Sequence, residues 1–373
     1  MKRKQLKIWL LLLTVGAIFA ACEGPAGVDG LNGADGAPGS DGVDGTDGNA
    51  TCMACHSTET KTNIESQFAM SVHAAGAIAV DYAGGRKDCA ECHSHQGFVQ
   101  FATTGKVTGD ITNPMAWECA TCHGLHETME AGDYALRMSD PVKLFYDRTT
   151  EIDFSNSENS NSNLCANCHQ ARSTDPLIAD PDLTEYTLKS YSGFHHGPQA
   201  NVLAGTGFVE FEGSIQYPDV GSAGHLSQAS CTGCHMAEFN LVDGVGSYGQ
   251  PVEVGQGGHS FIPTIKSCND CHSGADLESS DHYDYGGART LIQAQLDALR
   301  DRLVELGTIT VTVVDGENVY AANTSGPLPI LHVRAYYNWH GVDEDRSTGV
   351  HNPKYVRAIL NNSLEALVGE TAP

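Results

Sequence analysis

The chain has 373 residues, enough for two or three domains of ordinary size, and 40% of them are hydrophobic. Its 46 acidic side chains outnumber the 21 basic ones, which gives a formal net charge of −25 at pH 7. A field of this sign repels nucleic acids and anionic lipid surfaces and attracts basic partners, so we expect no binding of nucleic acid. An equally good interpretation is that the negative charge only keeps the protein soluble.

The first 21 residues are typical of a secretory leader, because a Lys/Arg-rich start precedes an apolar run at 8–19. This run is too short to span a bilayer as a helix. Two alanines directly before Cys22 resemble a bacterial lipobox, although Phe19 stands where Leu is usual. We therefore interpret residues 1–21 as a lipoprotein signal peptide and Cys22 as the lipidated residue. An ordinary cleavage site that leaves a free thiol is the alternative.

Residues 24–50 form nine uninterrupted Gly-x-y triplets. A Gly at every third position is the collagen signature, because only Gly fits at the axis of a triple helix. However, the segment has only Pro25 and Pro38 to stiffen it, and its five aspartates would repel one another across three chains. We favour a flexible, lipid-anchored, collagen-like tether over residues 22–50, with a trimerising stalk as the alternative.

One pentapeptide pattern, Cys-x-x-Cys-His, recurs six times between residues 52 and 272. It is the attachment signature of a c-type haem: two cysteines one helical turn apart bond the vinyl groups of one porphyrin edge, and the next histidine ligates the iron. Half a zinc site or a redox dithiol also uses Cys-x-x-Cys, but neither requires a histidine after every pair. We therefore predict six covalently bound haem c groups. The cysteines are Cys52, Cys55, Cys89, Cys92, Cys119, Cys122, Cys165, Cys168, Cys231, Cys234, Cys268 and Cys271, and the proximal histidines are His56, His93, His123, His169, His235 and His272.

The spacing of the motifs predicts the architecture. The 221 residues from the first motif to the last leave about 37 for each haem, too few to wrap each one separately. We expect the haems to pack against one another in a mainly α fold with extensive loops, as a hexahaem cytochrome c domain over residues 51–287. A C-terminal helical region over residues 288–373 is expected to pack on it.

The remaining histidines are candidates for the distal iron ligands. The chain has 17 histidines, so eleven remain after the six motifs. His126 lies three residues after His123 on the same side of that haem, so we expect it to ligate a neighbouring haem instead. Methionine would raise the reduction potential, but the surplus of histidine favours bis-His ligation. The candidates are His73, His126, His195 or His196, His225 and His259, with the sixth position open between His351, His282, His340, His332 and His95.

The last hundred residues carry no motif but have periodic apolar patterns. Ile292, Leu296, Leu299, Leu303 and Leu306 step by three and four, which predicts an amphipathic helix ending at Gly307. Alternating residues around Asp315-Gly316 predict a small β-hairpin. Asn352-Pro353 is typical of a helix start, followed by a second apolar stripe at Val356, Leu360, Leu364 and Leu367.

Over residues 70–368 the chain resembles a bacterial multihaem cytochrome family distantly related to the pentahaem nitrite reductases and octahaem reductases. The segments that carry the resemblance are SVHAAG, CAECHSHQGFVQFATTG, CATCHGLHETM, ALRMSDPV, FHHGPQANVLAGTG, HLSQASCTGCHM, GGHSF and YYNWHGVDEDRSTGVHNPKYVRAIL. The last segment resembles the long helices that follow the final haem and build dimers in the reductases. Those nitrite reductases usually carry Lys in place of one motif histidine, and this chain has no Cys-x-x-Cys-Lys.

These patterns predict a carrier or conduit of electrons at the cell envelope rather than a catalyst. We expect an exported, lipid-anchored protein at the outer membrane or cell surface, with a periplasm-facing position left open. Its expected partners are other redox proteins such as cytochromes, and extracellular acceptors. The rival interpretations are a reductase of nitrogen or sulfur oxyanions with one open haem site, and a structural collagen-like trimer. Whether the chain is a dimer or a trimer stays open.

Overall fold

The computed structural model describes residues 52–53, 55–128, 133–156, 160–172, 180, 182–245, 250–269, 271–272 and 284–373. The expected leader, the tether with Cys22, and His282 lie outside the described residues. Residues 55–373 form one compact unit, and the fold described below is that of this unit. No helix in the described ranges is both long and apolar enough to cross a membrane.

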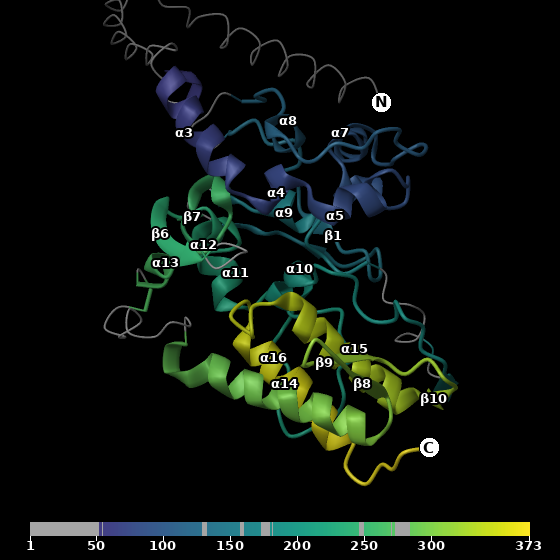
Figure 1. The fold of residues 1–373 in the computed structure, drawn as a ribbon. Coiled ribbons are helices and arrows are strands. Elements are labelled where there is room, and N and C mark those ends of the chain that lie inside the picture. The colour runs from purple at the N-terminus through teal and green to yellow at the C-terminus, as the bar shows by residue number, and fades with distance from the viewer. Residues whose placement is uncertain are drawn as a thin grey trace, which may run out of the picture. The chain divides into compact units, whose positions relative to one another are not determined.

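The regular structure is mainly helical, as predicted, and the helices of the motif region are short (Figure 1). Long loops separate some of them, such as residues 105–118 between α7 and α8, whereas α4, α5 and η1 follow one another almost directly. Several begin with a side-chain cap, such as Ser57, which accepts a hydrogen bond from the Thr60 N–H at 3.1 Å. The helices of this region are α3 (Thr58–Ala69), α4 (Val72–Ala75), α5 (Ala77–Ala79), the π-helix η1 (Val80–Gly84), α6 (Ala90–His93), α7 (His95–Thr104), α8 (Cys119–Cys122), α9 (Asn163–Ala166), α10 (Gln199–Ala204), α11 (Gly224–Gln228), α12 (Thr232–His235), the 3-10 helix η2 (Gly258–Ser260) and α13 (Lys266–Asn269).

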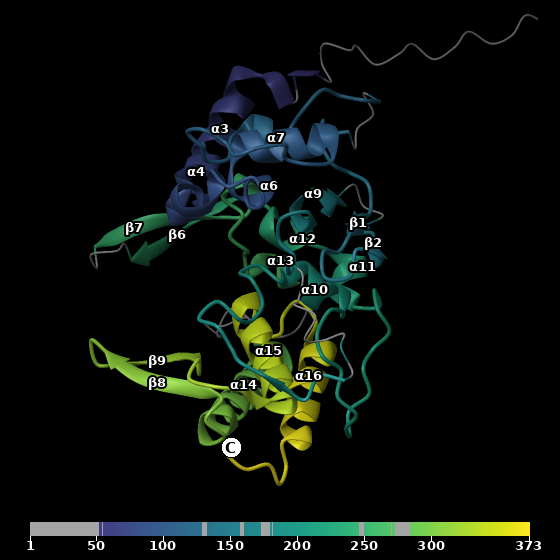
Figure 2. The ribbon, with the colours of Figure 1, turned by 90° about the vertical axis from the view of Figure 1, so that its right-hand side faces the viewer.

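The strands form two-stranded antiparallel pairs. In the segment expected to form a hairpin, β8 pairs with β9 from Ile309 opposite Ala322 to Val314 opposite Glu317. These two strands extend away from the neighbouring helices (Figure 2). The pairs are β1 (Val142–Lys143) with β2 (Glu151–Ile152), β3 (Ser155–Asn156) with β4 (Ser160–Asn161), β5 (Glu185–Tyr186) with β10 (Leu328–Pro329), β6 (Asn240–Val245) with β7 (Pro251–Gln256), and β8 (Ile309–Val314) with β9 (Glu317–Ala322).

The C-terminal region is built from three helices that pack on one another: α14 (Ala288–Glu305), preceded by the 3-10 helix η3 (Tyr285–Gly287), α15 (Ile330–Asp345) and α16 (Pro353–Ala366) (Figure 1). The predicted stripe of α14 is confirmed, because Ile292, Leu296, Leu299 and Leu303 are all buried. The predicted start of α16 is confirmed too, since the side chain of Asn352 accepts a hydrogen bond from the Tyr355 N–H at 3.2 Å.

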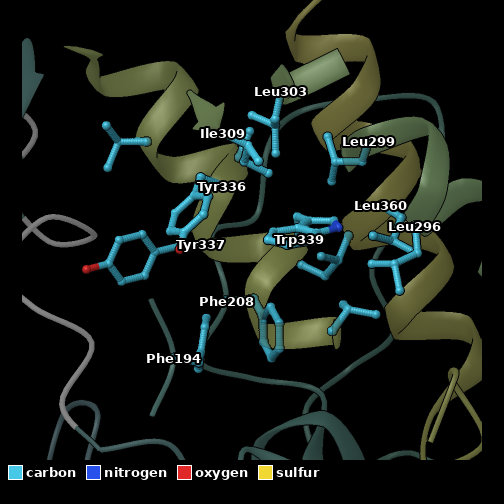
Figure 3. Close-up of a cluster of buried hydrophobic side chains, with 14 of the residues drawn as sticks. Phe194, Phe208, Leu296, Leu299, Leu303, Ile309, Tyr336, Tyr337, Trp339 and Leu360 are labelled. Carbon is cyan, nitrogen blue, oxygen red and sulfur yellow. The ribbon is translucent and has the colours of Figure 1, made fainter. Parts of the chain in front are cut away.

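Helix α15 lies inside this hydrophobic core, surrounded by apolar side chains of α14, α16 and the 194–208 segment (Figure 3). Phe194 and Phe208 stack with ring centroids 4.5 Å apart against Gly341 of α15. A Cβ atom at Gly341 would come within 2.6 Å of each of these rings, so only glycine allows this close approach. The contact ties the C-terminal helices to the loop that carries His195 and His196.

Candidate haem sites

The motifs adopt the local geometry that their spacing requires. In five of them the N–H of the motif histidine donates to the carbonyl of the first motif cysteine over 2.8 to 3.1 Å, closing one helical turn. One turn puts both thiols on the same side of the backbone, where they can reach the same porphyrin edge. The twelve motif cysteines are free thiols rather than disulfides. Below, sites 1 to 6 are numbered by the order of the motifs.

Each motif histidine faces one histidine from elsewhere in the chain. The ring centroids in these pairs are 5.8 to 6.4 Å apart. The pairs, from site 1 to site 6, are His56 with His126 (6.2 Å), His93 with His195 (5.8 Å), His123 with His259 (6.4 Å), His169 with His73 (6.0 Å), His235 with His351 (6.4 Å), and His272 with His225 (6.1 Å).

These distances match two imidazoles bound to opposite sides of one metal ion. A metal–imidazole nitrogen bond is about 2.0 Å long, so the two nitrogen atoms lie about 4 Å apart and the ring centroids about 6 Å apart. At site 2 the two Nε2 atoms face each other directly, 3.5 Å apart. Each site offers two imidazole nitrogens that can ligate an iron and two thiols that can bond the vinyl groups of a porphyrin. These are the groups that a bis-His haem c requires, so the residues present fit it.

In six of these rings the hydrogen bond is made by Nδ1, so Nε2 is left to face the partner ring. Metal-bound histidines usually donate their other ring N–H to a carbonyl or carboxylate, which fixes the tautomer and the ring orientation. Here that donor is Nδ1 at sites 1, 3, 4, 5 and 6. The bonds run from His126 to Asp133 O (2.9 Å), His123 to Tyr134 O (2.7 Å), His169 to Gln199 Oε1 (3.4 Å), His235 to Phe261 O (2.8 Å), His351 to Asp345 Oδ1 (2.7 Å) and His225 to Val350 O (2.5 Å).

In six of these rings burial lowers the pKa and so favours the neutral imidazole, the form that binds a metal. Burial, and then the charge of His169, lowers the pKa of His73 to about 4. Burial, and then the guanidinium of Arg172, lowers the pKa of His195 to about 4. At His351 burial also lowers the pKa, but the Asp345 carboxylate outweighs it through its charge and hydrogen bond, so the pKa is raised overall.

Neighbouring sites are linked by direct contacts between their motifs. The Cys92 thiol of site 2 lies 3.8 Å from the carbonyl oxygen of Asn167, which stands inside the site 4 motif, and the Cys168 thiol lies 4.0 Å from Glu91 O of site 2. The hydroxyl of Ser162, just before α9, accepts hydrogen bonds from the backbone N–H groups of Cys231 and Thr232 at 3.1 and 3.2 Å. Site 4 therefore lies next to both site 2 and site 5.

Two further links come from the chain itself. His126, which faces the site 1 histidine, follows the site 3 motif by three residues. His225, which faces the site 6 histidine, precedes the site 5 motif by six residues and lies in α11. A short segment that serves two sites keeps those sites close, so sites 1 and 3 are neighbours, as are sites 5 and 6.

The other candidate histidines have different surroundings. The His196 side chain is 78% exposed and its Nδ1 bonds Glu344 Oε2 at 2.8 Å, so His195 rather than His196 faces site 2. His95 bonds the Thr121 hydroxyl at 2.8 Å, and buried His332 bonds Glu370 Oε2 at 3.1 Å. His340 packs its ring against Tyr336 and Trp339. Among the described residues, no group of three or more His, Cys, Asp and Glu side chains is arranged to hold a metal ion.

The sequence patterns missed the residues that support the paired histidines. Buried Asp345, which bonds His351, is one such residue, and Gln199, which bonds His169, is another. Asp345 stands only six residues before His351, so an acidic residue close to a candidate ligand was the available signal. Gln199 had no comparable signal, because its contact with His169 depends on the fold.

No family model and no curated protein matches the chain. Among solved structures, it is similar to one described as "Crystal Structure of Outer Cell Wall Cytochrome OcwA", with a TM-score of 0.48 and 16% identity. The match covers 82% of this chain and 50% of that chain, so the chain spans about half the length of the solved structure. A likeness this remote carries no argument about function.

Proposed function

We propose that the chain is a multihaem c-type cytochrome that transfers electrons through six closely packed, bis-His haems. The observation that carries this proposal is the pairing of every motif histidine with a non-motif histidine at a distance that suits one metal ion between them. When bound, haem c supplies one-electron chemistry at its iron.

The protein's own residues have three tasks in this function. The paired cysteines would hold each haem covalently, and the paired imidazoles would ligate its iron. The carbonyl and carboxylate acceptors of the Nδ1 protons fix the planes of the rings and raise the basicity of the ligands. Two imidazoles at each iron would leave no open position for a substrate, which favours electron transfer over reduction of an oxyanion.

The proposed location and partners rest on the sequence alone. We propose that the leader exports the chain and that Cys22 anchors it by lipid at the cell envelope, with residues 24–50 as a tether. The acidic surface suits basic redox proteins as partners. Other cytochromes and extracellular electron acceptors are the proposed classes, and a dimer or trimer is compatible with them.

The ligand geometry suggests a test by electron paramagnetic resonance (EPR). The oxidised mature protein should show only low-spin ferric signals, and nitrite, hydroxylamine or tetrathionate should leave them unchanged. Four of the ligand pairs have interplanar angles of 71° to 87°, whereas sites 3 and 5 have 36° and 31°. Two classes of low-spin signal are therefore expected. A high-spin signal that responds to one of these compounds would favour the oxyanion reductase instead.

A further inference from the structure

Phe261 has an unusual backbone conformation. Its φ of 59° lies in the left-handed region, which bulky side chains rarely adopt. It follows the 3-10 helix η2, and its neighbours hold it there: the Phe261 N–H donates to Gly258 O at 3.4 Å, and the Gly257 N–H donates to Ile262 O at 2.7 Å. Strained positions of this kind persist where the surrounding structure enforces them, and they are concentrated at functional sites.

This conformation lets Phe261 contact histidines of three different sites. Its carbonyl accepts the hydrogen bond from Nδ1 of His235, the motif histidine of site 5, at 2.8 Å. Its ring lies 5.0 Å from the ring of His73, at an interplanar angle of 89°, and 5.8 Å from the ring of His259, at 62°. His73 faces the site 4 histidine and His259 faces the site 3 histidine.

We propose that Phe261 is a positioning residue shared by sites 3, 4 and 5. Its carbonyl orients His235 and makes this ligand more electron-rich, while its ring holds the planes of His73 and His259. The inference rests on the proposed function, because these rings matter in this way only as iron ligands. Since three neighbouring sites meet at one residue, a change there alters several haems at once.

Ordinary packing predicts a different outcome. Phe261 also contacts Phe68, with ring centroids 6.4 Å apart, so its ring fills space in an apolar contact. If filling space were its whole role, any change would alter stability and leave the ligand field of each iron as it was. The potentials and the EPR signals separate the two roles, because both report on the axial ligands themselves.

The test uses the full-length mature protein with three substitutions. F261G removes the ring and keeps a backbone that tolerates positive φ, so the carbonyl should stay on His235. F261V places a β-branched residue where positive φ is costly, which should move the carbonyl as well. F261Y retains both features and should restore wild-type behaviour. F101L is the matched control, because Phe101 of α7 packs on Phe98, with ring centroids 6.5 Å apart.

We expect two low-spin signals to change in F261G and three in F261V, with six haems retained in each. In F261V the potential of one haem should also rise, on the order of tenfold in its reduction equilibrium constant, or 59 mV for one electron. Unchanged signals in F261G, or equal changes in F101L, would overturn the proposal. Haem counting of the wild type tests the proposed function separately: fewer than six haems would contradict that function, whereas six haems with unchanged signals in F261G would contradict only the role of Phe261.

Discussion

His195 and His196 are adjacent in the chain but have different roles in the proposed account. Nε2 of His195 lies 3.5 Å from Nε2 of His93, whereas His196 points to Glu344 and is mostly exposed. Local sequence cannot separate the two, because both stand in the same Gly-Phe-His-His-Gly context. Only the fold decides which ring reaches site 2.

Replacing these two histidines should therefore have unequal effects. In H195A the proposed haem of site 2 would lose one of its two histidine ligands, so one haem should become high-spin. H196A removes the same side chain from the next position and should leave the spectra unchanged. EPR and visible spectroscopy on both variants check this prediction, and a high-spin haem in H196A with a normal H195A would refute it.

Asp345 should tune the potential of site 5. Its side chain is fully buried, accepts a hydrogen bond from Nδ1 of His351 at 2.7 Å, and is also held by the Ser347 hydroxyl. A carboxylate at this position makes the imidazole a stronger donor and favours ferric iron. D345N should raise the potential of one haem by about 59 mV, which is a tenfold change in the equilibrium for one electron.

A redox titration of the mature protein measures this shift. The control is D343N, which removes the same charge two residues earlier in α15. The prediction is contradicted if the two variants shift the same haem equally, because the effect would then come from net charge and not from the bond to His351.

At the scale of elements, the C-terminal helices should depend on their buried stripe. Leu299 of α14 is fully buried, whereas Leu291 of the same helix is 42% exposed. L299A should lower the free energy of unfolding of this region by about 2–5 kcal/mol, since it leaves a cavity in the core. L291A should change it by about 0.5 kcal/mol. Denaturant unfolding, followed by circular dichroism, measures the free energy of unfolding of both variants. Similar decreases in L299A and L291A would argue against the core as described.

The elements that the sequence predicted are those with a periodic signal. Helices α14 and α16 each bury one stripe, so their apolar spacing predicts them. Helix α15 is buried on nearly all sides and includes buried His332, Asn338 and Asp345, so no stripe marks it. The β6–β7 pair was missed as well, because Asp243, Gly244 and Pro251 are residues typical of turns.

The candidate sites also divide into residues that the sequence predicts and residues that only the fold identifies. The six motifs are local and can be read directly from the chain. The facing histidines come from distant segments, so the sequence narrowed them to candidates without assigning each to a site. Residues that act through a backbone atom, such as Phe261 on His235, have no sequence signal beyond their proximity to a candidate ligand.

At the scale of the whole molecule, the contacts give the proposed haems an order. Site 4 adjoins sites 2 and 5 through their motifs, and site 3 through Phe261, whose ring contacts both His73 and His259. Site 1 is joined to site 3 by the segment that carries His126, and site 6 is joined to site 5 by the segment that carries His225. Site 4 is therefore the proposed junction of a branched array, and both histidines of site 1, at one of its ends, are exposed residues.

The excess of acidic over basic residues, 46 against 21 over the whole sequence, should govern which partners exchange electrons quickly. A basic redox protein should react about tenfold faster at about 0.01 M salt than at about 1 M, because screening shortens the range of the attraction. An acidic redox protein of similar potential should show the opposite trend. Stopped-flow kinetics measures both, and the same salt dependence for the two partners would contradict electrostatic steering.

Anomalous diffraction at the iron absorption edge, from crystals of the mature protein, tests the central claim most directly. The account predicts six iron peaks, each between Nε2 of one motif histidine and Nε2 of its partner among His126, His195, His259, His73, His351 and His225. Fewer peaks, or an iron with a different or missing second ligand, would contradict it.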